Sequence, residues 1–153
     1  MDESGKKVGT MFKGEYSHAI DAKARLIIPS KFREILGNEF VVTKGFDGCL
    51  FVFANEGWEQ FEAKLQALPL DKTEARQIGR FFIAGAIDAE VDKQGRILLP
   101  GNLLNYAAIE KEAVVAGVGN RVEIWSSERW SDTTTFEDIN DIAAKMSEWG
   151  LSI

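Results

Sequence analysis

The chain has 153 residues, of which 45% are hydrophobic, and a formal net charge of −6. This length suits one domain, or two small units that share a core, because about 70 residues alone bury little surface. The single Cys49 excludes an intramolecular disulfide framework, and no apolar run approaches the roughly 20 residues that span a bilayer. These features predict a cytoplasmic protein without a membrane segment.

The chain begins with a small, polar leader at residues 1–10, which we expect to be disordered or derived from cloning. The stretches 14–20 and 25–28 are predicted to be strands joined by a tight turn, forming a first hairpin. A short helix at 31–36 follows, and Gly37 is placed to end it as a left-handed cap.

Two apolar-rich strands, 39–44 and 49–54, are predicted to flank a turn that begins and ends with glycine. Asn55 is expected to cap the next helix, in which apolar residues recur at helical spacing. Pro69 ends this helix.

Asp71, with Glu74 three residues on, is predicted to form a capping box at the start of a helix that runs to about Ile83. The second half of the chain then repeats the plan of the first. Its predicted strands are 86–91, 96–99, 113–116 and 121–125.

The last segment, residues 131–153, contains five acidic residues against one lysine, a local balance of −4. Its apolar residues lie three or four positions apart, which predicts an amphipathic helix. They are Phe136, Ile139, Ile142 or Ala143, Met146 and Trp149. Two interpretations stay open: the apolar face packs on the chain's own body, which is the commoner outcome, or it contacts a subunit or partner.

A nine-residue pattern occurs twice, as Asp21–Pro29 and Asp92–Pro100. Each copy contains an Asp, a polar turn, an Arg, three aliphatic residues and a Pro. The copies begin 71 residues apart, and further matches follow at a spacing of 72: Val42 with Val114, Gly45 with Gly117, Leu50 with Val122, Phe53 with Trp125, and Trp58 with Trp130. The pattern predicts an internal duplication, with repeats at 11–70 and 71–130 that share one pseudo-symmetric body.

The two repeated turns carry polar and basic side chains, namely Lys23 and Arg25 in the first and Lys93, Gln94 and Arg96 in the second. A two-stranded hairpin fits the major groove of DNA, where Lys and Arg contact phosphates and Arg pairs with guanine. The alternative is that the aspartate of each turn only braces the arginine by a local ion pair, which contributes little when exposed.

Charge is unevenly distributed along the chain. Residues 13–33 contain five basic residues against two acidic ones, a local balance of +3, although the whole chain is acidic. Exposed charges more than about 8 Å apart are largely screened at physiological salt, so the local potential matters more than the total. The basic residues of this stretch are Lys13, Lys23, Arg25, Lys31 and Arg33.

Catalytic chemistry has little support in the sequence. His18 is the only histidine and Cys49 the only cysteine, too few for a His-based triad or a Cys/His metal site. The glycine-rich stretch 117–120 lacks the lysine of a phosphate-binding loop and is predicted to be a hairpin turn. We therefore expect no enzymatic activity, metal site, cofactor or small-molecule substrate.

Seven short stretches carry a specific signal in combination: Met11–Glu15, Ile20–Arg25, Ile28–Arg33, Phe46–Leu50, Arg80–Gly85, Asp92–Arg96 and Gly117–Trp125. Together they resemble the MraZ family of bacterial transcriptional regulators, whose two AbrB-like units each carry a D-x-x-G-R motif. The resemblance covers the chain from Met11 to about Trp130.

The resemblance implies an α+β fold, a pseudo-symmetric double-split β-barrel of the swapped-hairpin type with short flanking helices and a C-terminal helix. It also implies ring-shaped homo-oligomers in the nucleoid. These would bind short repeated boxes on double-stranded DNA upstream of the cell-division and cell-wall gene cluster, and regulate their own operon. The family's DNA-contacting motif falls here on Asp21, Lys23 and Arg25, and on Asp92, Lys93, Gln94, Gly95 and Arg96.

One position departs from the family pattern, because Ala24 stands where the second copy keeps Gly95. A turn with Asp first and Gly fourth favours a positive φ at the fourth residue. Strain of roughly 1 kcal/mol is therefore expected at Ala24. With Asp21 and Asp92 as the other turn-shaping residues, we expect the first turn to differ in shape from the second.

Three function classes follow, of which a sequence-specific DNA-binding regulator is favoured. The second is a ring-forming scaffold or protein-interaction module whose basic turns meet an acidic partner, and the third is an enzyme. The first copy is the more basic, so replacing Arg25 should weaken DNA binding more than replacing Arg96.

Overall fold

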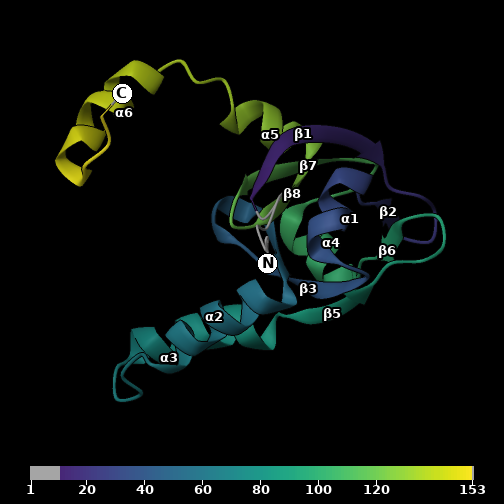
Figure 1. Cartoon of the computed structure of the whole chain (residues 1–153), viewed down its shortest axis with the longest axis horizontal. Coiled ribbons are helices and arrows are strands. Elements are labelled where there is room, and N and C mark those ends of the chain that lie inside the picture. The colour runs from purple at the N-terminus through teal and green to yellow at the C-terminus, as the bar shows by residue number, and fades with distance from the viewer. Residues whose placement is uncertain (1–10, 153) are drawn as a thin grey trace, which may run out of the picture.

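The computed structural model describes residues 11–152, which form an antiparallel sheet covered by short helices (Figure 1). Six strands form one sheet in the order β1-β7-β8-β4-β3-β5, and β2 and β6 form a separate two-stranded ribbon. The strands are β1 Phe12–Ala19, β2 Arg25–Ile27, β3 Glu39–Lys44, β4 Leu50–Ala54, β5 Ile87–Glu90, β6 Arg96–Leu98, β7 Glu112–Gly119 and β8 Val122–Ser126. The predicted α+β class is confirmed.

The helices are short and lie between or beside these strands. They are α1 Ser30–Leu36, α2 Asn55–Gln66, α3 Thr73–Gly79 with a π-helical turn at Arg80–Ala84, α4 Gly101–Ala107, α5 Ser127–Thr133 and α6 Ile139–Met146. Shorter 3₁₀ turns occur at Phe46–Gly48 and Ser147–Trp149. No helix in residues 11–152 is long and apolar enough to cross a membrane.

The strands of the two repeats are exchanged. β1 of the first repeat pairs with β7 of the second, and β5 of the second pairs with β3 of the first. The central pair β4–β8 and the ribbon β2–β6 each join one strand from either repeat. The two repeats therefore form one body in which each completes the sheet of the other.

The prediction that the two strands of each copy form a hairpin is wrong in its strand pairing. The tight turn forms, but β1 continues into an eight-residue ladder with β7, whereas β2 pairs with β6. Pairing β2 with β6 turns Leu26 and Ile97 together into the core, where both are buried. If each copy formed a hairpin of its own, Leu26 and Ile97 would not be paired with each other.

The four central strands of the six-stranded sheet, β7, β8, β4 and β3, are buried on both faces, and alternate residues of each strand point to opposite sides. One face, the ribbon and helices α1 and α4 enclose the larger core, which includes Leu26, Phe32, Phe40, Ile97 and Leu103. The other face packs an aromatic cluster with α2 and the π-helical turn, including Phe51, Phe53, Trp58, Phe82 and Trp125.

Two predicted helix starts are wrong in detail. Asn55 is the first residue of α2 rather than its cap, and its side-chain amide donates to the Glu39 carbonyl at 3.3 Å. α3 begins two residues after Asp71, without a side-chain cap. Gly37 ends α1 with φ 82° and ψ −170°, so its φ is positive but it is not a left-handed helical cap.

The C-terminal helix α6 is shorter than the predicted segment and stands away from the body (Figure 1). Its apolar face is open, with Ile139 and Ile142 each 47% exposed, and Trp149 in the 3₁₀ turn that follows is 80% exposed. The prediction that this face packs on the chain's own body is therefore wrong, and the alternative of a subunit or partner contact stays a prediction.

Candidate nucleic-acid interface

The two repeated turns have the same hydrogen bonds. In the first, the Ala24 N–H donates to the Asp21 carbonyl at 3.0 Å and the Asp21 N–H to the Arg25 carbonyl at 3.0 Å. The Asp21 carboxylate also accepts the backbone N–H groups of Lys23 and Arg25 at 2.9 and 2.8 Å. Each turn is therefore closed by its own aspartate.

The second turn repeats this pattern. The Gly95 N–H donates to the Asp92 carbonyl at 3.0 Å, and the Asp92 carboxylate accepts the N–H groups of Gln94 and Arg96, each at 2.9 Å. Ala24 has φ 62° and Gly95 has φ 82°. The expected difference in turn shape is therefore wrong: Ala24 adopts the positive φ, because the hydrogen bonds of the turn outweigh roughly 1 kcal/mol of strain.

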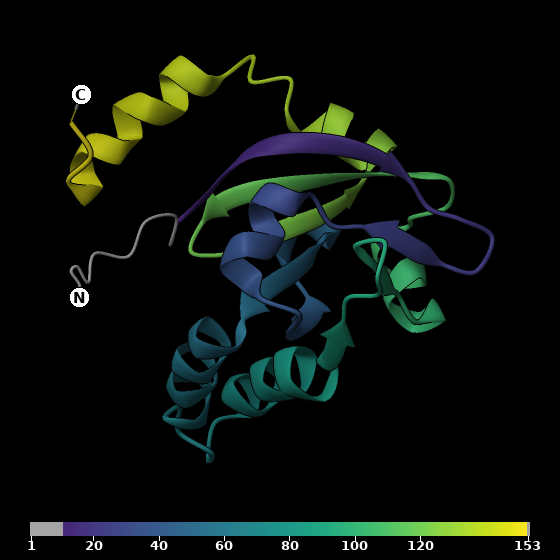
Figure 2. The same ribbon diagram turned by 45° about the vertical axis from the view of Figure 1, so that its right-hand side comes forward.

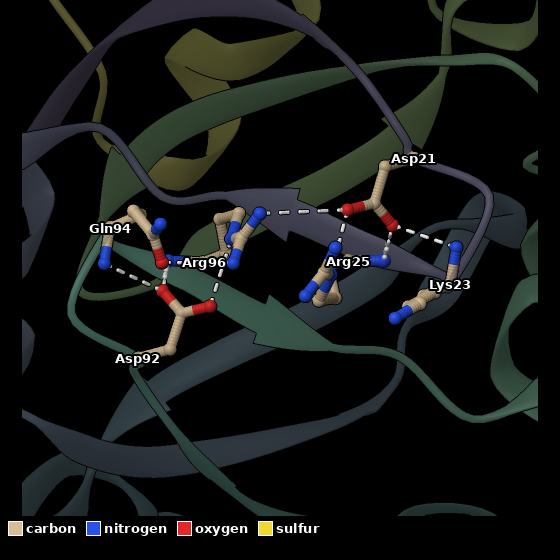
Figure 3. Close-up of polar contacts among 6 residues, drawn as sticks. All are labelled: Asp21, Lys23, Arg25, Asp92, Gln94 and Arg96. Atoms are coloured by element: carbon tan, nitrogen blue, oxygen red, sulfur yellow. Dashed lines mark hydrogen bonds and ion pairs between the residues drawn. The ribbon is translucent and has the colours of Figure 1, made fainter.

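The two turns also share the geometry of the arginine that ends each of them (Figure 3). Arg25 Nε donates to Asp21 Oδ2 at 2.7 Å, and Arg96 Nε donates to Asp92 Oδ2 at 2.8 Å. A weaker contact joins the copies, with 3.8 Å between Arg96 Nη1 and Asp21 Oδ2. Both arginines are thus held in a defined orientation while remaining partly exposed.

The hydrogen bonds of each turn lower the pKa of its aspartate. Backbone N–H donation by Arg25 to Asp21, and by Arg96 to Asp92, is the main cause that lowers the pKa of each carboxyl. A lowered folded-state pKa contributes stability that is fully present above the ordinary aspartate pKa and is lost as the pH falls through the folded value. The braced turns are therefore expected to persist throughout the neutral range.

The ribbon places the two turns at its opposite ends (Figure 3). Antiparallel pairing sets Arg25 opposite Leu98 and Ile27 opposite Arg96. Bonds of 2.9 Å, from the Ile28 N–H to the Gly95 carbonyl and from the Leu99 N–H to the Ala24 carbonyl, tie each strand to the other turn. The ribbon and its turns therefore form one continuous surface, on the side of the body opposite α6 (Figure 2).

The predicted contact residues do not all lie on this surface. Lys23, Lys93 and Gln94 are exposed in the turns. Lys13 lies near the start of β1, eight residues before Asp21 in the chain, and lines a separate hollow with Lys31. These two lysines are therefore not brought together with the turns.

Arg33 has a structural role that the sequence did not indicate. Its Nε donates to the Ile28 carbonyl at 2.9 Å, and its guanidinium lies over the backbone of the second turn, at Gly95. A Cβ added at Gly95 would lie 2.8 Å from Arg33 Cζ. Arg33 thus links the first repeat to the turn of the second, and only the folded chain brings them together.

Replacing Gly95 with Ala is expected to lower the free energy of unfolding by about 1–2 kcal/mol, because it combines a positive φ with displacement of Arg33. Ala24→Gly should be tolerated or mildly stabilising, since it relieves strain in an equivalent turn. Urea unfolding monitored by circular dichroism measures both changes. The double variant Gly95→Ala/Arg33→Ala is the control for the clash, and an undiminished stability of Gly95→Ala would contradict this account.

The described residues offer little for catalysis. Within residues 11–152, no three His, Cys, Asp or Glu side chains gather into a cluster that could hold a metal ion. Cys49 is fully buried, and burial raises the pKa of its thiol, which disfavours the reactive thiolate.

Comparison with known proteins identifies the family. The chain matches the family model of the MraZ protein twice, over residues 11–81 and 82–147. It is 57% identical over 142 residues to the Transcriptional regulator MraZ of Lachnoclostridium phytofermentans, covering 93% of this chain and 99% of that relative. It is 52% identical over 143 residues to that of Moorella thermoacetica, covering 92% and 100%. These relatives are named as regulators, not as enzymes, and the chain belongs to the MraZ family.

Proposed function

We propose that this chain is a sequence-specific DNA-binding transcriptional regulator that places the β2–β6 ribbon in the major groove. The observation that carries the proposal is the pair of arginines, Arg25 and Arg96, each oriented by an aspartate on one two-stranded ribbon. A guanidinium held through Nε keeps terminal N–H groups for guanine O6 and N7. The names of the relatives agree with this function.

Individual roles follow from charge and exposure. Arg25 and Arg96 would contact bases, while the exposed Lys23, Lys93 and Gln94 would contact phosphates and sugars beside them. The aspartates would shape the turns, since a carboxylate repels phosphate. Lys13 and Lys31 lie outside this surface. Arg33 would stabilise the surface through its contacts with Ile28 and Gly95 rather than bind DNA.

We also infer that the fold is the swapped-hairpin, double-split barrel of AbrB-like proteins, built from repeats at 11–70 and 71–130 and followed by the segment 131–153. The exchange of β1 and β5 between the repeats supports this assignment. The two-stranded ribbon and the six-stranded sheet would be the two parts of the split barrel.

We further propose that the protein acts in the nucleoid as a homo-oligomeric ring on repeated DNA boxes. Its targets would lie upstream of its own operon, in the cell-division and cell-wall gene cluster. The uncovered apolar face of α6 supports self-association with a second copy of the chain.

Removing residues 135–153, which leaves α5 intact, should lower the mass measured by light scattering, and an unchanged mass would contradict an α6 contact.

DNA from upstream of the protein's own gene provides the direct test. We expect fluorescence anisotropy to detect tighter binding to this DNA than to a shuffled duplex of equal length. The logarithm of the affinity should fall by about 0.9 per neutralised phosphate for each unit of log salt. Equal affinity for both duplexes would contradict sequence-specific binding.

The exposed α6 face also favours a second candidate function, a ring-forming scaffold without base-specific DNA binding. In that case the chain would keep its oligomeric mass and bind shuffled and upstream DNA equally. The same two measurements therefore separate the two functions.

A further inference from the structure

The outer face of the β2–β6 ribbon carries two aliphatic side chains that remain exposed in the described chain. Ile27 is 37% exposed and Leu98 is 62% exposed, whereas the intervening Leu26 and Ile97 are buried. The two exposed residues occupy equivalent positions in the duplicated pattern, 71 residues apart. Both repeats thus present an aliphatic side chain at the same place.

These side chains alternate with the arginines. Arg25 lies opposite Leu98, and Ile27 lies opposite Arg96, so each arginine has an aliphatic neighbour across the ribbon. Directly opposite residues of an antiparallel pair have Cβ atoms about 4.5–5.5 Å apart on the same face. The outer face is therefore a mixed surface of two guanidinium groups and two aliphatic groups.

Phosphate contacts alone do not explain this composition. Aliphatic groups at a phosphate-binding surface would gain nothing from the charged backbone. In the major groove, however, the 5-methyl group of thymine is an apolar group at a base edge, and it lies within the same groove as the guanine O6 and N7 atoms that arginine recognises. A surface that alternates arginine and aliphatic residues matches this chemistry.

We propose that Ile27 and Leu98 contact thymine 5-methyl groups beside the bases that Arg25 and Arg96 contact. The ribbon then selects thymine next to guanine, with one such step read by each repeat. This inference rests on the proposed DNA-binding function and adds to it two specificity-determining residues and the base that they recognise.

Replacing thymine with deoxyuridine removes only the 5-methyl group and keeps the base pair. The upstream duplex is prepared with either nucleotide, so the box sequence need not be known. Burial of one methyl group corresponds to about a fourfold change in affinity, so the wild-type chain should bind the deoxyuridine duplex about fifteenfold more weakly when both contacts are lost.

The variant Ile27→Ala/Leu98→Ala should bind the thymine duplex more weakly and should bind both duplexes nearly equally. The matched control is Leu68→Ala/Leu70→Ala, which alters two leucines of comparable exposure, 36% and 76%, on the α2–α3 side of the body. This control should keep the full preference for thymine. Urea unfolding of both variants shows whether either loses its fold.

Three results would overturn the inference. Equal binding of the two duplexes by the wild-type chain would exclude methyl recognition, even if upstream DNA is still preferred over shuffled DNA. If the variant Ile27→Ala/Leu98→Ala still prefers the thymine duplex, the preference arises from DNA shape and not from contacts with these side chains. A change of oligomeric mass in that variant, with the thymine preference kept, would assign the aliphatic pair to a subunit contact. Failure to prefer upstream DNA at all would instead reject the proposed function itself, and the inference with it.

Discussion

DNA with three properly spaced boxes is expected to bind the full-length protein roughly 10²–10⁴-fold more tightly than DNA with one box. Several identical ribbons on one ring can contact several boxes of the same molecule, and each contact after the first is intramolecular. Upstream DNA shortened box by box, as located by footprinting, provides the ligands. Fluorescence anisotropy at constant salt measures the affinities.

The chain that lacks residues 135–153 is the matched control for this avidity. If α6 joins the subunits, the shortened chain should bind one box with unchanged affinity and lose most of its preference for three boxes. Equal affinity of the full-length protein for one and three boxes would exclude a multivalent ring. Tighter single-box binding by the shortened chain would show that the acidic segment competes with DNA.

Arg25→Ala is expected to weaken binding to upstream DNA by about 1–3 kcal/mol, the usual loss for an arginine that contacts guanine through two hydrogen bonds. Arg96→Ala should weaken binding to the same DNA by a smaller amount. Within residues 11–152 the Arg25 guanidinium is held through Nε alone, which leaves its terminal nitrogens available. Arg96 also donates from Nη2 to Gln94 Oε1 at 2.9 Å, and its Nη1 lies near Asp21.

Arg80→Ala controls for the loss of one positive charge, because Arg80 is exposed on the π-helical turn, which packs in the other core cluster from the ribbon. Its effect on affinity should be small. Gln94→Ala frees one terminal nitrogen of Arg96 and should narrow the difference between the two arginine variants. A larger loss for Arg96→Ala than for Arg25→Ala would show that the free terminal nitrogens do not decide base contact.

Local sequence accounts for the elements that could be predicted. Each turn is closed within five consecutive residues, so an Asp and an Arg four positions apart suffice to indicate it. Strands β3 and β4 were predicted correctly to within one residue from their apolar runs. The predicted caps at Asn55 and Asp71 were wrong, because residue types that cap helices also occur at other positions. The Asn55 side chain makes a different contact, and α3 has no side-chain cap.

The sequence by itself determined the duplication, the α+β class, the family and the positions of the two turns, because each is recognised from short runs of consecutive residues. Only the tertiary structure decided that β2 pairs with β6, that Arg33 lies over Gly95 and that the apolar face of α6 is open. Strand pairing and packing depend on which surfaces can be buried together, and the partners here are about 70 residues apart. Pairing β2 with β6 buries Leu26 of one repeat and Ile97 of the other in one shared core.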